Sequence, residues 1–239
     1  MSLVIKDFIK GFSTEKRSRI LAYGSSNTER YLPGLHWFDC FELAIRQKYG
    51  RVHTCINTGL SGDTSRGLLQ RFKDDAAFYD PNLVFITIGG NDCNPEQNLD
   101  IVEFRSNLIA LYRSFSAFDC GVIFQTYYSP DPDECETEHI NKFYDYTDVV
   151  REVAEETGSM LIDHLFRWER LRINYNDIYK NLMRDGFHVK PNGNKVMGVD
   201  IARHFGVDLR ESELDGWEEA LAVQELMDEL VKGRLNNEF

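Results

Sequence analysis

Residues Leu83 to Asp92 read LVFITIGGND, and this stretch decides the fold. Its first six residues are apolar or β-branched without interruption, which is typical of a strand buried on both faces of a parallel sheet. Gly89 and Gly90 then allow the backbone to bend sharply, and Asn91 and Asp92 follow. Because ligands of parallel α/β sheets bind beyond the carboxyl ends of the strands, the stretch predicts a strand together with a functional loop.

Four similar apolar runs occur elsewhere in the chain: RILAY at 19–23, VHTCI at 52–56, GVIFQTY at 121–127 and SMLID at 159–163. Between the runs, apolar residues stand three or four positions apart, as in amphipathic helices, over 37–49, 65–78, 100–118 and 138–156. Strands that alternate with helices predict an α/β fold whose right-handed crossovers cover both faces of the sheet. We therefore predict a flavodoxin-like, three-layer α/β/α domain with a five-stranded parallel sheet.

We expect this domain to cover residues 19–209, between an N-terminal segment, 1–18, and a C-terminal tail, 210–239. The tail predicts an amphipathic helix capped by Ser212, because its apolar residues stand at helical spacing and its acidic residues fall on the other face. The stripe consists of Trp217, Ala220, Leu221, Val223, Met227, Leu230 and Val231. Such a stripe needs a partner surface, so the helix either packs on its own domain or forms a contact in a homodimer.

The overall charge is strongly negative and argues against two classes of partner. The chain of 239 residues has 27 Lys and Arg against 39 Asp and Glu, which gives a net charge of −12. A negative field repels phosphate backbones and anionic lipid surfaces. We therefore expect neither a nucleic acid nor a membrane as partner, and we look for a small-molecule substrate instead.

The cysteines and the N-terminal residues indicate the compartment. Five cysteines are odd in number and form no CxxC pair, which fits neither a disulfide framework nor a zinc site. Residues 1–19 alternate short apolar pieces with charged residues, unlike the uninterrupted apolar core of a signal peptide. Both features favour a cytoplasmic protein with reduced thiols.

Two further strand ends carry small, polar clusters. Gly24-Ser25-Ser26 follows the first strand, and a Gly-x-Ser sequence there predicts either an exposed nucleophilic hydroxyl or an ordinary turn and helix cap. The cluster from Asn57 to Ser65 follows the second strand, and its glycines allow a backbone amide to point at a ligand oxygen. After the third strand, Asn91 offers an uncharged amide donor for an oxyanion, or else it forms an Asx-turn.

The last cluster, DGFHVKPNG at 185–193, precedes an apolar-periodic stretch over 195–204. A carboxylate three residues before an imidazole can fold back and accept from its Nδ1–H, which leaves Nε2 facing a nucleophile. As metal ligands, Asp185 and His188 would need further partners, and no other histidine stands at a ligand spacing from them. The pair therefore favours acid–base chemistry over metal binding.

In order, GSSNT, SGDTS, GGND and DGFHVKPNG resemble the four blocks of the SGNH, or GDSL, hydrolase family, and the resemblance spans roughly residues 19–205. It implies a serine esterase that needs neither metal nor cofactor. It also implies that Ser26 is the nucleophile, with Asp185 and His188 as its catalytic partners. The Ser26 and Gly62 amides and the Asn91 side chain would form the oxyanion hole.

One position departs from the family pattern, in which Gly-Asp-Ser forms the first block. Here Ser25 replaces the aspartate, so two hydroxyls are adjacent and a carboxylate that braces the loop is missing. The register of Gly-x-Ser favours Ser26 over Ser25 as nucleophile. Loss of the acid either weakens the packing of the first loop, or Asp63 or Asp92 supports the loop in its place. Ser25 is a further candidate for loop support.

The resemblance implies ester hydrolysis, and the loops indicate the kind of ester. No long apolar lid is visible, and the loop after the fourth strand is rich in polar groups that suit hydroxyl-rich alcohols: Tyr127, Tyr128, Asp131, Asp133 and Glu134. We therefore expect hydrolysis of short-chain acyl esters, above all O-acetyl groups of carbohydrates. The alternatives are a lysophospholipase or thioesterase, a ligand-binding member of the fold without activity, and a metal phosphoesterase, which the absence of Asp or His in GSSNT disfavours.

Overall fold

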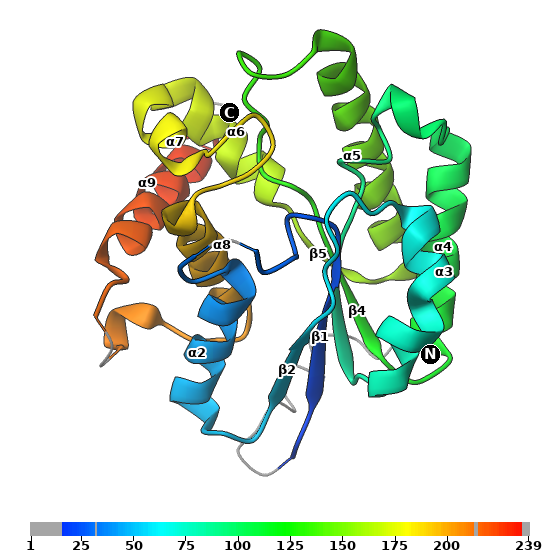
Figure 1. The fold of residues 1–239 in the computed structure, drawn as a ribbon. Helices are drawn as coiled ribbons and strands as arrows, with labels where there is room; N and C mark the ends of the chain where they lie inside the picture. The colour runs from blue at the N-terminus through cyan, green and yellow to red at the C-terminus, as the bar shows by residue number, and fades with distance from the viewer. Residues whose placement is uncertain (1–15, 32, 213–214, 236–239) are drawn as a thin grey trace. The chain divides into compact units, whose positions relative to one another are not determined.

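The computed structural model describes residues 16–31, 33–212 and 215–235 (Figure 1). The chain divides into two compact units. The first, which we call the sheet unit, takes in the residues up to Arg30, then Tyr49–Tyr127 and Glu136–Ile162. The second, the helical unit, takes in Tyr31–Lys48, Tyr128–Cys135 and the residues from Asp163 onward. Most of the predicted segment 1–18 lies outside the described residues.

The sheet unit contains five parallel strands in the order β2-β1-β3-β4-β5. The strands are β1 (Arg19–Gly24), β2 (Thr54–Asn57), β3 (Leu83–Thr87), β4 (Gly121–Gln125) and β5 (Met160–Ile162). This is the flavodoxin-like order, in which the direction of winding reverses between β1 and β3. The predicted fold class is confirmed, and the loops that carry Ser26 and Asn91 leave the two strands at the reversal.

Burial explains why these runs form strands. Every residue of β3 and β4 is buried, as is β1 from its second residue on. β1 pairs with β3 so that Ile20 lies opposite Leu83 and Gly24 opposite Thr87. A strand buried on both faces cannot alternate polar and apolar side chains, which is why LVFITI is continuous.

Helices α3 (Ser65–Asp75), α4 (Ile101–Ser116) and α5 (Thr137–Thr157) pack next to one another beside the sheet (Figure 1). Two of them begin at side-chain caps, because Thr64 accepts from the Gly67 amide and Asp100 from the Glu103 amide. The helix predicted over 65–78 is shorter in the structure, because the backbone leaves the helical conformation at Ala76 and a 3-10 turn follows at Ala77–Tyr79.

The helical unit is built from α2 (Trp37–Tyr49), α6 (His164–Asn174), α7 (Asn176–Leu182), α8 (Pro191–His204) and α9 (Glu218–Leu235). Helix α9 packs on α6 and α8. Four residues of its predicted stripe are buried in this contact: Trp217, Ala220, Val223 and Met227. The sequence pattern did not predict α6 or α7.

Two further helix boundaries differ from the expected ones. α8 begins four residues earlier than the apolar period indicates, because Pro191 is well suited to the first turn of a helix. Ser212 does not cap the tail helix; it ends a 3-10 turn, Leu209–Glu211, and its hydroxyl bonds Gln47. α9 begins only at Glu218, after Gly216 with φ +94°.

A search of the described segments for a membrane-crossing helix finds none with sufficient length and apolarity.

Candidate active site

Three loops leave the carboxyl ends of strands in the sheet unit: loop 1 (residues 25–30), loop 2 (58–64) and loop 3 (88–94). Hydrogen bonds join loop 2 to the chain around loop 1. The Leu60 amide donates to the Gly24 carbonyl over 3.1 Å, and the Ser61 amide donates to Glu29 Oε2 over 2.9 Å. The predicted nucleophile and oxyanion segments of this unit therefore lie side by side.

The two adjacent serines of loop 1 have different surroundings. Ser25 is fully buried, and its Oγ lies 2.7 Å from the Tyr127 hydroxyl. Its carbonyl oxygen accepts from the amides of Thr28 and Glu29 and so closes a tight turn. Ser26 lies within this turn and is half-buried. Because Ser25 is held inside the protein, the contacts favour Ser26 as the residue that meets a substrate.

Tyr127 connects loop 1 to loop 3. It follows β4 and is buried, and burial raises the pKa of its hydroxyl, so it remains protonated. A side-chain Cβ at Gly90 would lie only 3.1 Å from Tyr127 Cζ, which explains the glycine in loop 3. Our expectation that the polar groups of Tyr127, Tyr128 and Asp131 are available to a hydroxyl-rich alcohol is wrong, because all three residues are buried.

Gly62 and Asn91 lie on loops 2 and 3. Gly62 has φ +78°, a left-handed conformation that favours glycine, and it is exposed. Asn91 Nδ2 donates to the Asp63 carbonyl over 2.8 Å, which joins the two loops. The side-chain nitrogen of asparagine carries two hydrogens, so this bond uses one of the two N–H donors of Asn91 Nδ2.

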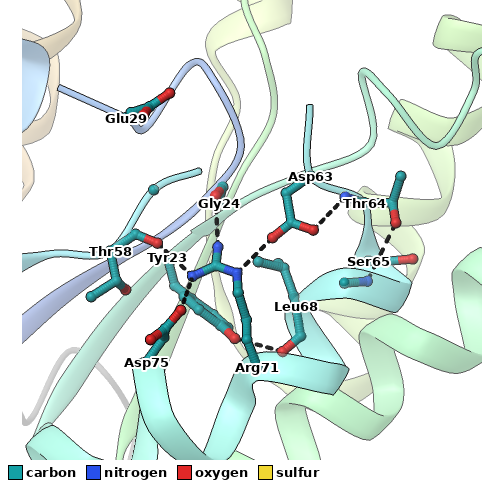
Figure 2. A network of polar contacts seen from close by, with 12 residues as sticks. Tyr23, Gly24, Glu29, Thr58, Asp63, Thr64, Ser65, Leu68, Arg71 and Asp75 are labelled. Atoms are coloured by element: carbon teal, nitrogen blue, oxygen red, sulfur yellow. Dashed lines mark hydrogen bonds and ion pairs between the residues drawn. The ribbon is translucent and has the colours of Figure 1, made fainter. Parts of the chain in front are cut away.

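Arg71 on α3 holds the loops from below (Figure 2). Its guanidinium donates to Asp63 Oδ2 at 2.7 Å, to the Thr58 carbonyl at 2.6 Å and to the Gly24 carbonyl at 3.1 Å. It also lies 4.5 Å from the centre of the Tyr23 ring. Asp63 thus supports loop 1 through Arg71, a residue that the sequence analysis missed because nothing in its local pattern distinguishes it from a surface arginine.

We predict that Arg71→Met lowers the free energy of unfolding by about 3 kcal/mol, because it leaves a mostly buried carboxylate and two carbonyls without their donor. The side chains of Arg71 and Asp63 are only 14% and 8% exposed, so water replaces the guanidinium poorly. Urea unfolding followed by circular dichroism measures the change. Arg66→Met on the same helix is the control, because its salt bridge with Glu103 is exposed and contributes under about 1 kcal/mol. Equal losses in the two variants would contradict the prediction.

Asp92 supports loop 3. It is 1% exposed, and its Oδ1 accepts from the Ser65 amide at the start of α3 over 2.8 Å. Burial raises the pKa of Asp92 to about 6, although the bonds to Ser65 oppose the rise. Oδ2 has no hydrogen-bond partner among the described residues. Asp63 and Asp92 therefore both support the loops, each at a different point.

We predict that Asp92→Asn flattens the dependence of stability on pH. The pKa of Asp92 is above its ordinary value of 3.8 in the folded chain, so its ionisation opposes folding, and stability falls as pH rises from about 4 through 6. At about 1.4 kcal/mol per pKa unit, the variant should gain up to about 3 kcal/mol relative to wild type across that range. Urea unfolding between about pH 4.5 and 7 tests this. Parallel curves for the two proteins would show that Asp92 does not titrate in this range.

The helical unit carries the remaining two predicted residues on one tight turn. His188 Nδ1 lies 2.8 Å from Asp185 Oδ1, which also accepts the amides of Phe187 and His188. Burial raises the pKa of Asp185, but the bonds from Phe187 and His188 outweigh it and the net pKa is lowered. The ionised carboxylate thus accepts from Nδ1–H, which leaves Nε2 as the basic nitrogen.

The surrounding chain fixes this turn. The Tyr128 hydroxyl donates to the Phe187 carbonyl over 2.7 Å, and the Asp131 amide donates to the Gly186 carbonyl over 2.9 Å. A Cβ at Gly186 would lie 2.3 Å from Cys135 Sγ, so only glycine fits there. Tyr128 and Asp131 therefore support the turn that carries Asp185 and His188 from within the protein. In the described part of the chain, no three His, Cys, Asp or Glu residues are grouped so as to hold a metal ion.

Comparison with known proteins agrees with this description. The model of the GDSL-like Lipase/Acylhydrolase family matches residues 22–196. An acetylxylan esterase from Geobacillus stearothermophilus is 25% identical over 167 residues, which cover 64% of this chain and 72% of that protein.

Solved structures share the fold. The crystal structure of Axe2, an acetylxylan esterase from Geobacillus stearothermophilus, matches with a TM-score of 0.69 and 24% identity, over 80% of this chain and 95% of that one. The acetyl xylan esterase AlAXEase matches with a TM-score of 0.69 and 18% identity, over 78% and 98%. Because the family model covers most of the chain, with all five predicted catalytic and oxyanion-hole residues inside its limits, the chain belongs to the GDSL-like lipase/acylhydrolase family and is a carboxylic ester hydrolase.

Proposed function

We propose that the protein removes acetyl groups from the hydroxyls of carbohydrates. The observation that carries this proposal is the acetylxylan esterase among its relatives, which aligns over 167 residues. Among the esters that a member of this family could cleave, an acetylated sugar agrees best with that relative. A lysophospholipase, a thioesterase and a binding protein without activity are not favoured by any relative described above.

The proposed reaction passes through an acetyl-enzyme. His188 Nε2 takes the proton of the Ser26 hydroxyl while Ser26 Oγ attacks the ester carbonyl, and Asp185 stabilises the imidazolium that forms. The tetrahedral oxyanion accepts from the amides of Ser26 and Gly62 and from the side chain of Asn91. It collapses when His188 returns the proton to the sugar oxygen. Water then attacks the acetyl ester of Ser26 in the same way, which releases acetate and restores the enzyme.

We predict that Asn91→Ala lowers kcat about 10²- to 10³-fold, the usual cost of losing one oxyanion donor. The variant also loses the bond to the Asp63 carbonyl, so its stability must be measured alongside its rate. Asn94→Ala is a matched control, because the Asn94 side chain caps the short 3-10 helix Pro95–Gln97 by accepting from the Glu96 amide. A wild-type rate in a folded Asn91→Ala protein would remove Asn91 from the mechanism.

Acyl specificity tests the proposed substrate. The enzyme is assayed on p-nitrophenyl acetate, butyrate and decanoate and on acetylated xylo-oligosaccharides, with a chelator present throughout. We expect activity to be highest toward acetate, to survive the chelator, and to release acetate from the oligosaccharide. A preference for decanoate would support a lipolytic enzyme instead. Loss of activity with the chelator would indicate a metal enzyme, and inactivity on every ester would indicate a binding protein.

A further inference from the structure

An exposed aromatic ring contacts the proposed catalytic histidine. The ring centres of Tyr31 and His188 are 6.3 Å apart and the planes meet at 88°, an edge-to-face contact. Although it is a large aromatic residue, Tyr31 is 41% exposed. The bond to Asp185 fixes the orientation of the imidazole that Tyr31 contacts.

Arg184 lies over the same tyrosine. Its guanidinium carbon is 5.5 Å from the centre of the Tyr31 ring, and its Nη1 donates to the Tyr31 hydroxyl over 3.2 Å. The Arg184 main chain is held by a 2.7 Å bond from its amide to the His188 carbonyl. Arg184 is exposed. Tyr31 and Arg184, which we call the Tyr31–Arg184 pair, thus form an ordered aromatic and cationic surface next to His188.

The direction of proton transfer identifies the part of the substrate that lies next to the Tyr31–Arg184 pair. In the proposed acylation step, His188 protonates the oxygen of the departing alcohol, and a general acid must lie within hydrogen-bond distance of the atom that it protonates. The alcohol part of the ester therefore lies beside the imidazole. Side chains that contact the imidazole and keep an exposed surface lie at the alcohol part of the site and away from the acetyl group.

We propose that the Tyr31–Arg184 pair binds the sugar that leaves in acylation, an inference that rests on the proposed function. A pyranose ring has apolar C–H groups on its faces, which pack against an aromatic ring, and hydroxyls on its rim. A guanidinium presents up to five donors in a planar fork, which suits neighbouring hydroxyl oxygens. A tyrosine provides contact area at a low cost in side-chain entropy. The pair combines both kinds of contact beside the atom that receives the proton.

The test compares two acetate esters that differ only in the alcohol. For wild type, Tyr31→Ala and Arg184→Ala, kcat and KM are measured on an acetylated xylo-oligosaccharide and on ethyl acetate. We expect the ratio of the two kcat/KM values, oligosaccharide over ethyl acetate, to fall at least about tenfold in each variant, the loss of one hydrogen bond to a charged group. The change should appear mainly in KM for the oligosaccharide.

Phe166 and Arg170 provide a matched control in the same unit. The Arg170 guanidinium carbon lies 3.5 Å from the centre of the Phe166 ring, and Phe166 is 42% exposed. Phe166→Ala and Arg170→Ala should leave the ratio unchanged, because the contacts given for this pair join the two residues to each other on α6 and do not include His188. A tenfold fall in these variants too would overturn the assignment of sugar binding to the Tyr31–Arg184 pair.

Failure of the proposed sugar site and failure of the proposed function give different results. If Tyr31→Ala and Arg184→Ala lower both kcat/KM values equally, the pair only supports His188 and the proposed sugar site is wrong. If wild type hydrolyses ethyl acetate but releases no acetate from the oligosaccharide, the proposed function itself fails, and the sugar site fails with it. The second outcome is seen in wild type alone, before any variant is compared.

Discussion

Replacement of Ser26 by alanine should lower kcat on acetate esters by at least about 10⁴-fold, because no covalent acetyl-enzyme can form without its hydroxyl. Replacement of Ser25 should leave most of the activity. Ser25 is buried against Tyr127, so Ser25→Ala removes one internal hydrogen bond and costs about 1–3 kcal/mol of stability for the unpaired tyrosine hydroxyl. The two variants therefore separate chemistry from loop support at adjacent positions.

Initial rates on p-nitrophenyl acetate, corrected for the folded fraction by circular dichroism, measure this difference. Both variants remove one hydroxyl oxygen and nothing else, so each is the control for the other. A Ser25→Ala protein that is folded but inactive, beside an active Ser26→Ala protein, would reverse the assignment of the nucleophile.

Asp185→Asn should lower kcat about 10⁴-fold with little change in fold. The carboxylate accepts from His188 Nδ1–H at 2.8 Å, which places the basic lone pair of the imidazole on Nε2. The asparagine amide can donate to Nδ1 instead, which moves the ring proton to Nε2 and removes the base. The oxygen of asparagine can still accept the amides of Phe187 and His188, so the turn should persist.

Asp133→Asn provides a control of equal charge change, because Asp133 is exposed and its carboxylate forms a salt bridge with Lys180 at the surface. Steady-state kinetics on p-nitrophenyl acetate should give nearly wild-type values for this variant. If kcat of the Asp185→Asn enzyme lies within about tenfold of the wild-type value, the histidine tautomer does not depend on Asp185.

The strands and the loops after them could be predicted because burial of a strand requires a pattern of residues that is visible in the local sequence. A strand covered on both faces needs a continuous apolar run, and LVFITI meets that need whatever the rest of the chain does. Helix α6 was missed because the sequence prediction assigned Asp163 to the fifth strand, whereas in the structure its side chain caps this helix. Helix α7 was missed because it has only seven residues and its N-cap residue, Tyr175, makes no side-chain cap bond. The start of α9 was placed too early because Ser212 resembles an N-cap, whereas in the structure it ends the 3-10 turn Leu209–Glu211 and α9 begins only at Glu218.

The supporting residues of the site could not be predicted from local sequence. Arg71 reaches loops that precede it in the chain, and Ser25 meets Tyr127 only after β4 takes its place in the sheet. Polar character alone misled the prediction for Tyr128 and Asp131, which suit a sugar chemically but are buried. Tertiary contacts, rather than residue type, decide which polar groups support the site and which meet a substrate.

Labelling with a fluorophosphonate tests the central claim most directly, because this reagent reacts with a serine that a neighbouring base has activated. Wild-type protein is labelled, digested, and sequenced by fragmentation mass spectrometry that resolves Ser25 from Ser26. We predict that wild-type protein carries one phosphonyl group, on Ser26, and that Ser26 carries none in the His188→Ala variant. Label on Ser25, or label on Ser26 that persists without His188, would contradict it.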